Sequence, residues 1–241
     1  MATTTTTSYI SNGKTISCEV YPTTAANGGA VVIAYGSDGM IDNSNGPWAT
    51  MLREYAAGLA AKGFTAMIPD YFLTTGTLAG SIDYRRDGAQ IVLRNLDKWT
   101  SSLTEAVTHA KTLAGVDSKR VGLLGFSLGG HLGLRLRSSL NVLVEFFAPV
   151  LVGIGAAGPG SHLKVQIHHG KIDTATRAGD SLVPFEANAI PIVQQLRNEG
   201  SSVDLHEYLG AGHGFVGGDA ANMSAATQSK SRTIAFFASN L

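Results

Sequence analysis

The 241-residue sequence has little cysteine and no excess of charge of either sign. Cys18 is its only cysteine, which excludes an internal disulfide framework and a metal site built from cysteines. Lysine plus arginine equals aspartate plus glutamate at 18 each, so no net field attracts nucleic acid or an anionic membrane. We therefore expect the protein to act on a small molecule.

The sequence also lacks a long apolar run and a targeting segment. Its most apolar stretch, NVLVEFFAPVLVGIGAAG, is interrupted by Glu145 and Pro149, short of the roughly 18 apolar residues that a membrane span needs. The start, MATTTTTSYI, has no basic segment followed by an apolar one, so it does not look like a secretory signal. We expect a soluble cytoplasmic protein, a monomer or homodimer, with residues 1–7 as a frayed tail.

What the sequence does contain is an alternation of strand and helix patterns. Two alternating runs flank Asn12-Gly13, a pair that favours a hairpin turn, and Cys18 falls on the apolar face of the second run. Further strands are expected at 29–36, 64–72, 120–126, 141–149, 163–170 and 201–210, and helices at 47–63, 89–114, 128–140, 184–200 and within 223–241. This alternation predicts a single α/β domain over residues 1–241, with a mostly parallel sheet covered by helices on both faces.

Reactive side chains follow three of these strands, at the edge where an open parallel sheet binds its ligands. Ser127 lies in GFSLGG, Asp173 in HHGKID and His213 in GAGHGF, in the chain order serine, acid, histidine. A serine hydroxyl becomes a nucleophile when a histidine takes its proton and a carboxylate orients that histidine. The pattern predicts a catalytic triad; the alternative is a glycine-rich turn whose serine only caps the following helix.

The motifs GFSLGG, HHGKID, LVPFEA and YLGAGHGF make the sequence, from about Ala30 onward, resemble the dienelactone hydrolase family of the α/β-hydrolase superfamily. The resemblance implies an eight-stranded sheet without a large cap domain, ester or lactone hydrolysis, and no cofactor. It also implies Ser127 as nucleophile, His213 as base, and the amides of Leu128 and Ser37 as oxyanion hole. The family proper has a cysteine in place of Ser127 and a glutamate beside the loop that reads YGSDG here. We therefore expect a serine esterase, lactonase or acyl hydrolase.

Two aspartates compete for the role of the acid. Asp173 fits the family pattern H-G-x-x-D, whereas Asp180 fits the pattern D-x-x-V-P, and the segment TATRAG separates the two. The acid has to reach His213 from the end of its strand, and an insertion before the acid would loosen that placement. Asp173 is therefore the predicted acid, and Asp180 is the alternative.

Other residues near the strand ends are candidates for contact with the substrate. Gly36, Tyr71 and Arg85 are the three predicted here, and for Arg85 a solvated surface position is the alternative. His168 and His169 are adjacent on a strand and point to opposite faces, so they cannot chelate one metal, and no metal site is predicted.

The predicted function is hydrolysis of small-molecule esters or lactones through an acyl-enzyme on Ser127. Acyl transfer by the same triad is one alternative, and a non-catalytic ligand-binding member of the fold is another. No long insertion precedes residue 163. This predicts an open, shallow site that prefers short, water-soluble substrates.

Overall fold

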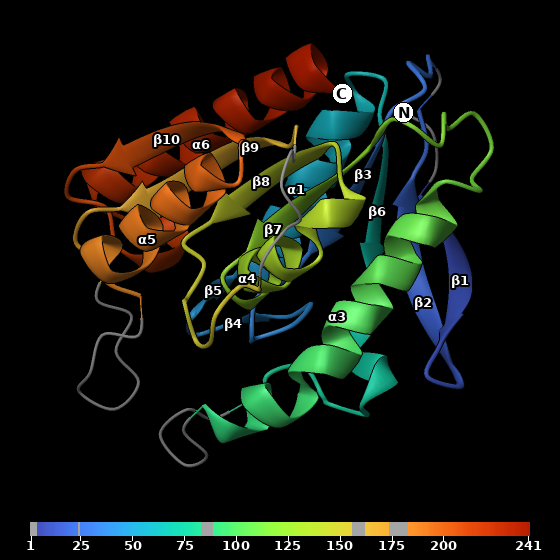
Figure 1. Cartoon of the computed structure of the whole chain (residues 1–241), viewed down its shortest axis with the longest axis horizontal. Coiled ribbons are helices and arrows are strands. Elements are labelled where there is room, and N and C mark those ends of the chain that lie inside the picture. The colour runs from blue at the N-terminus through green and yellow to red at the C-terminus, as the bar shows by residue number, and fades with distance from the viewer. Residues whose placement is uncertain (1–3, 24, 83–88, 156–161, 174–182) are drawn as a thin grey trace.

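An eight-stranded sheet forms the centre of the computed structural model, which describes residues 4–23, 25–82, 89–155, 162–173 and 183–241 (Figure 1). Its strand order is β1-β2-β6-β3-β7-β8-β9-β10. The pairs from β6 to β10 are parallel, and β1 and β2 are added antiparallel at one edge. The strands are β1 Thr5–Ser11, β2 Lys14–Tyr21, β3 Ala30–Ala34, β6 Thr65–Pro69, β7 Val121–Phe126, β8 Val142–Phe146, β9 Lys164–Gly170 and β10 Ser202–Tyr208. The predicted fold class is confirmed.

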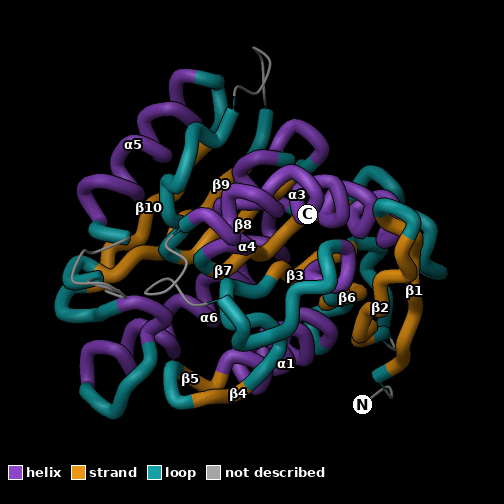
Figure 2. The backbone as a smooth tube through the Cα atoms, turned by 90° about the horizontal axis from the view of Figure 1, so that it is seen from below, coloured by secondary structure: helices purple, strands orange, loops and turns teal. Residues whose placement is uncertain are grey.

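Helices cover both faces of this sheet. The α-helices are α1 Trp48–Ala60, α3 Gln90–Ala110, α4 Leu128–Arg135, α5 Phe185–Asn198 and α6 Ala220–Asn240, with short 3-10 helices η1 Tyr71–Thr74, η2 Arg137–Ser139 and η3 His213–Phe215. Figure 2 shows α1 and α6 on one face and α3, α4 and α5 on the other. Because apolar strands such as β3, β7 and β8 are buried along their whole length, the core lies on both sides of the sheet.

The N-terminal hairpin forms where the sequence predicts it. Asn12 and Gly13 have φ of 48° and 74°, the left-handed conformation that a two-residue hairpin turn requires. The side chain of Cys18 is buried, as expected. The expected tail of residues 1–7 is too long, because Thr5–Thr7 pair with Cys18–Val20. Threonine is β-branched and fits a pleated strand, which the composition of the run alone did not indicate.

Two further details differ from the prediction. A two-stranded ribbon, β4 Asp42–Asn43 with β5 Gly46–Pro47, lies just before α1. Helix α6 begins at Ala220 rather than Met223, because the Asp219 side chain caps it by accepting a hydrogen bond from the Asn222 amide at 2.9 Å. Among the described residues, no helix is long and apolar enough to cross a membrane.

Candidate active site

Ser127 occupies a sharp turn between β7 and α4. Its backbone has φ 51° and ψ −114°, a strained conformation for a residue with a side chain. The flanking glycines make this turn possible: a Cβ on Gly125 would lie 2.4 Å from the Gly129 carbonyl oxygen, and one on Gly129 would lie 2.2 Å from the Ala34 oxygen. The Ser127 amide donates to the Phe146 carbonyl at 2.8 Å, which fixes the turn to the next strand. The strand-to-helix turn predicted from GFSLGG is confirmed.

Asp173 and His213 meet at the ends of β9 and β10. The Nδ1 of His213 donates to the Oδ2 of Asp173 at 2.8 Å, and the Asp173 side chain is fully buried. A proton on Nδ1 leaves Nε2 of the neutral imidazole free to accept one. The two loops touch because Gly170 has no side chain: a Cβ there would lie 2.2 Å from the Ala211 oxygen. The alternative acid, Asp180, lies outside the described residues.

Ser127 and His213 line one cavity of about 80 Å³. Gly36 and Ser37 line it as well, and a Cβ on Gly36 would lie 3.4 Å from the Ser127 Cβ. Leu128 is the first residue of α4, whose first-turn amides have no acceptor within the helix. The apolar lining comes from Trp48, Met51, Leu52, Phe126, Phe147, Pro149, Leu151 and Val183. The candidate nucleophile Ser127, the candidate base His213 and the candidate oxyanion donor Ser37 thus line one apolar cavity, and Leu128, the other candidate donor, directly follows Ser127.

Tyr71 does not line this cavity, so the prediction that it contacts the substrate is wrong. Its side chain is fully buried, its ring stacks on Tyr35 at 4.2 Å, and its hydroxyl donates to the Tyr35 carbonyl at 2.8 Å. The 3-10 helix η1 turns this segment into the core as soon as β6 ends. Tyr71 therefore supports the backbone that leads into the loop at Gly36. Arg85 lies outside the described residues.

His169 contacts the acid as well, a role that the sequence analysis missed. Its Nε2 donates to the Val183 carbonyl at 2.9 Å and lies 3.5 Å from Oδ2 of Asp173. Burial lowers the pKa of the His169 imidazole, which favours its neutral form. The carboxylate of Asp173 is thus flanked by two histidines, His169 and His213. The four-residue spacing between His169 and Asp173 is the sequence feature that could have predicted this contact.

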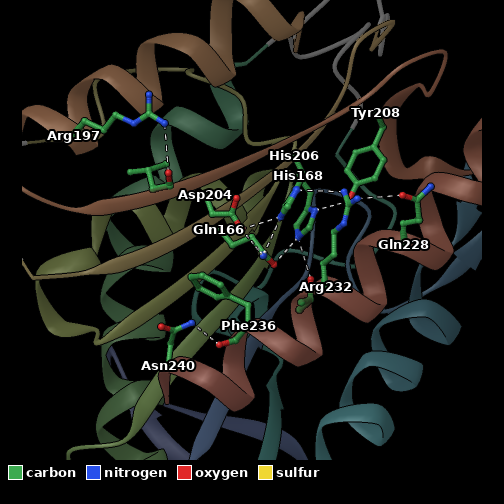
Figure 3. A network of polar contacts seen from close by, with 12 residues as sticks. Gln166, His168, Arg197, Asp204, His206, Tyr208, Gln228, Arg232, Phe236 and Asn240 are labelled. Atoms are coloured by element: carbon green, nitrogen blue, oxygen red, sulfur yellow. Dashed lines mark hydrogen bonds and ion pairs between the residues drawn. The ribbon is translucent and has the colours of Figure 1, made fainter.

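His168 lies on the opposite face, in the polar network shown in Figure 3. Its Nε2 donates to Oε1 of Gln166 at 2.9 Å, and its Nδ1 accepts from the Tyr208 hydroxyl at 2.8 Å. Its ring also stacks on that of His206 at 5.1 Å. Burial holds the pKa of His168 well below its usual value. These contacts support a structural role for His168.

A buried glutamate supports the wall of the cavity. The Oε2 of Glu145 accepts a hydrogen bond from the Ala148 amide at 2.9 Å, across a turn in which Phe147 has φ 41°. Complete burial raises the pKa of the Glu145 carboxyl to about 8, so it is mostly protonated at neutral pH. The Phe147 ring packs on the rings of His213 at 4.5 Å and Phe215 at 5.5 Å, and Phe215 also has a positive φ of 52°. The carboxyl of Glu145 therefore holds a turn whose Phe147 ring packs against His213.

Comparisons with known proteins give one family. The model of the dienelactone hydrolase family matches residues 20–241, and no curated protein sequence matches the chain. A dienelactone hydrolase-like promiscuous phosphotriesterase from metagenomic libraries has a TM-score of 0.72 at 19% identity, covering 99% of this chain and 98% of that one. Esterase 2 of Thermogutta terrifontis, phosphoramylated by tabun, has a TM-score of 0.64 at 18% identity, covering 97% and 94%. A serine hydrolase without lid from Xanthomonas campestris has a TM-score of 0.64 at 15% identity, covering 97% and 93%.

Proposed function

The chain belongs to the dienelactone hydrolase family, and on that premise we propose that it hydrolyses carboxylic esters or lactones through an acyl-enzyme on Ser127. The observation that carries this proposal is the 2.8 Å contact between His213 and the buried Asp173, in a cavity that Ser127 and His213 both line. A carboxylate at Nδ1 orients the imidazole and stabilises its cation, which is what a serine nucleophile requires of its base.

The proposed reaction has two halves. Ser127 Oγ attacks the ester carbonyl while Nε2 of His213 takes the hydroxyl proton, and the amides of Leu128 and Ser37 donate to the resulting oxyanion. The tetrahedral intermediate collapses, the carbon–oxygen bond to the alcohol breaks, and His213 gives its proton to the departing alkoxide. His213 then takes a proton from water, the hydroxide attacks the acyl-enzyme, and the acid leaves as Ser127 recovers its proton. Asp173 stays ionised throughout and stabilises the imidazolium.

The lining of the cavity favours a small, uncharged acyl group. Its volume is about 80 Å³, and most of its lining side chains are apolar. Among the described lining residues there is no lysine or arginine to receive a substrate carboxylate, and the carboxylate of Asp38 would repel one. This supports esters or lactones of short, neutral acids over substrates that carry a carboxylate.

A fluorophosphonate probe combined with p-nitrophenyl esters of graded acyl length tests the proposal. Wild type should be labelled by the probe and should turn over the short esters. Ser127→Ala should lose both the labelling and the turnover and keep its circular dichroism spectrum. Ser139→Ala, an exposed serine of η2, is the matched control. Undiminished turnover in Ser127→Ala would exclude the proposed nucleophile.

A further inference from the structure

Helices α1 and α6 lie side by side on one face of the sheet (Figure 2). They touch at Gly58, where a Cβ would lie 2.7 Å from Cδ1 of Ile234. One turn nearer the N-terminus of each helix, Lys230 and Glu54 form an ion pair of 2.8 Å across the gap. A cavity of about 510 Å³ lies along this contact, lined by Met51, Glu54 and Tyr55 of α1 and by residues of α6 between Ala226 and Ile234. Its size falls in the range of small-molecule sites.

The floor of this α1/α6 cavity is aromatic. The rings of Tyr55 and Phe126 pack at 5.1 Å, and those of Phe147 and Phe215 at 5.5 Å. The cavity that Ser127 and His213 line is called the catalytic cavity below. Phe126, Phe147 and Met51 line it as well, so the two cavities share a wall. Methionine has three rotatable bonds and adapts its shape at binding surfaces, so Met51 is the part of this wall that can yield.

The α1/α6 cavity lies on the side of the base. Gly214, the residue after His213, lines it, and a Cβ on Gly214 would lie 2.5 Å from the Trp48 ring. In the proposed reaction the alcohol oxygen takes its proton from His213, so the alcohol portion of the ester has to lie on this side. The acyl portion is bonded to Ser127 and therefore occupies the catalytic cavity, which is smaller than the α1/α6 cavity.

We propose that the α1/α6 cavity binds the apolar alcohol portion of the substrate, an inference that rests on the function proposed above. The substrate class is then an ester of a short acid with a linear or monocyclic apolar alcohol. The aromatic floor supplies the apolar contact, and the ion pair between Glu54 and Lys230 adds no net charge to the lining.

The test compares ethyl, butyl and hexyl acetate as substrates of the full-length protein. In wild type kcat/KM should rise with alcohol length, by up to about fourfold per methylene buried, which corresponds to ~0.8 kcal/mol. Ala226→Trp places an indole on the α6 wall of the cavity and should abolish this rise. Ala235→Trp makes the same change at an exposed position of α6 that lines neither cavity, and it should keep the rise. Ala226→Leu is a smaller filling variant for use if the tryptophan variant does not fold.

Each other outcome overturns the inference in a recognisable way. A flat alcohol series in wild type, or an equal loss for all acetates in the filling variants, would show that the cavity does not bind substrate. A loss confined to an acyl series, ethyl acetate to ethyl hexanoate, would assign the cavity to the acid portion instead. If no ester is hydrolysed in a manner that depends on Ser127, the proposed function itself fails, and the inference fails with it.

Discussion

Replacing Glu145 by glutamine should change how the stability of the protein depends on pH. The glutamine side chain has nearly the same shape, and its carbonyl oxygen can accept the hydrogen bond that Oε2 of Glu145 accepts from Ala148. It does not titrate. The substitution therefore removes the ionisation of one fully buried carboxyl and keeps the contact that holds the turn at Phe147.

The size of the effect follows from the pKa of the carboxyl. Burial raises the pKa of Glu145 from 4.5 to about 8, so between these values the folded protein keeps a proton that the unfolded chain has lost. The stability that this protonated carboxyl contributes is complete below pH 4.5 and is lost as the pH rises to about 8. At about 1.4 kcal/mol per pKa unit, the loss in free energy of unfolding is on the order of 5 kcal/mol.

Urea unfolding of wild type and Glu145→Gln across this pH range measures the effect directly. The free energy of unfolding of the variant, minus that of wild type, should increase between pH 4.5 and about 8 and level off above that. All other titrating groups are common to both proteins and cancel in the difference. Glu207→Gln, at an exposed position of β10, is the matched control for removal of a glutamate. A difference that stays constant with pH would refute the burial argument.

Three other predictions concern the site. Asp173→Asn should lower kcat for a short ester by about 10⁴, because His213 would be held in the wrong tautomer. The kcat of Asp180→Asn should stay within a few fold of wild type. The reverse result would make Asp180 the acid. Gly129→Ala should destabilise by about 3 kcal/mol or more, because its Cβ meets a backbone oxygen. Gly153→Ala, where a Cβ has nothing within 4 Å, is its control, and equal melting temperatures for the two would contradict the packing argument. In an acyl series of p-nitrophenyl esters, kcat/KM should fall toward long chains because the catalytic cavity is small, and a steady rise would show that it extends further than described.

The fold and the turn that carries Ser127 could be predicted because they depend on short-range patterns. A hairpin follows from Asn12-Gly13 and the alternating runs around it, and the position of Ser127 follows from glycines on both sides of a strand end. One general rule is needed in addition: parallel strands have their carboxyl ends at the same edge of the sheet. With it, the sequence brings the strand ends of Asp173 and His213 to the same side.

The side chains that were misplaced or missed depend on distant parts of the chain. Whether Tyr71 lines the cavity or enters the core is decided by its contact with Tyr35, which lies 36 positions away. Glu145 interrupts an apolar run, and only the packing of the neighbouring elements shows that its carboxyl is buried and holds a proton. The two-residue strands β4 and β5 are too short for any periodicity to predict them.

Among the described residues, backbone strain is concentrated around the cavity of Ser127 and His213 and the neighbouring α1/α6 cavity. In the described part of the chain four non-glycine residues have positive φ. Ser127 and Phe147 line the cavity of Ser127 and His213, Phe215 lines the neighbouring α1/α6 cavity, and the fourth is Asn12 in the hairpin turn. Each such residue costs roughly 1–3 kcal/mol, so the rest of the fold has to hold the site in place. Mild heating should therefore inactivate the protein before its helices melt. Thermostabilising substitutions are best sought away from these three positions, because a glycine that relaxed Phe147 or Phe215 would also remove the ring that shapes the cavity.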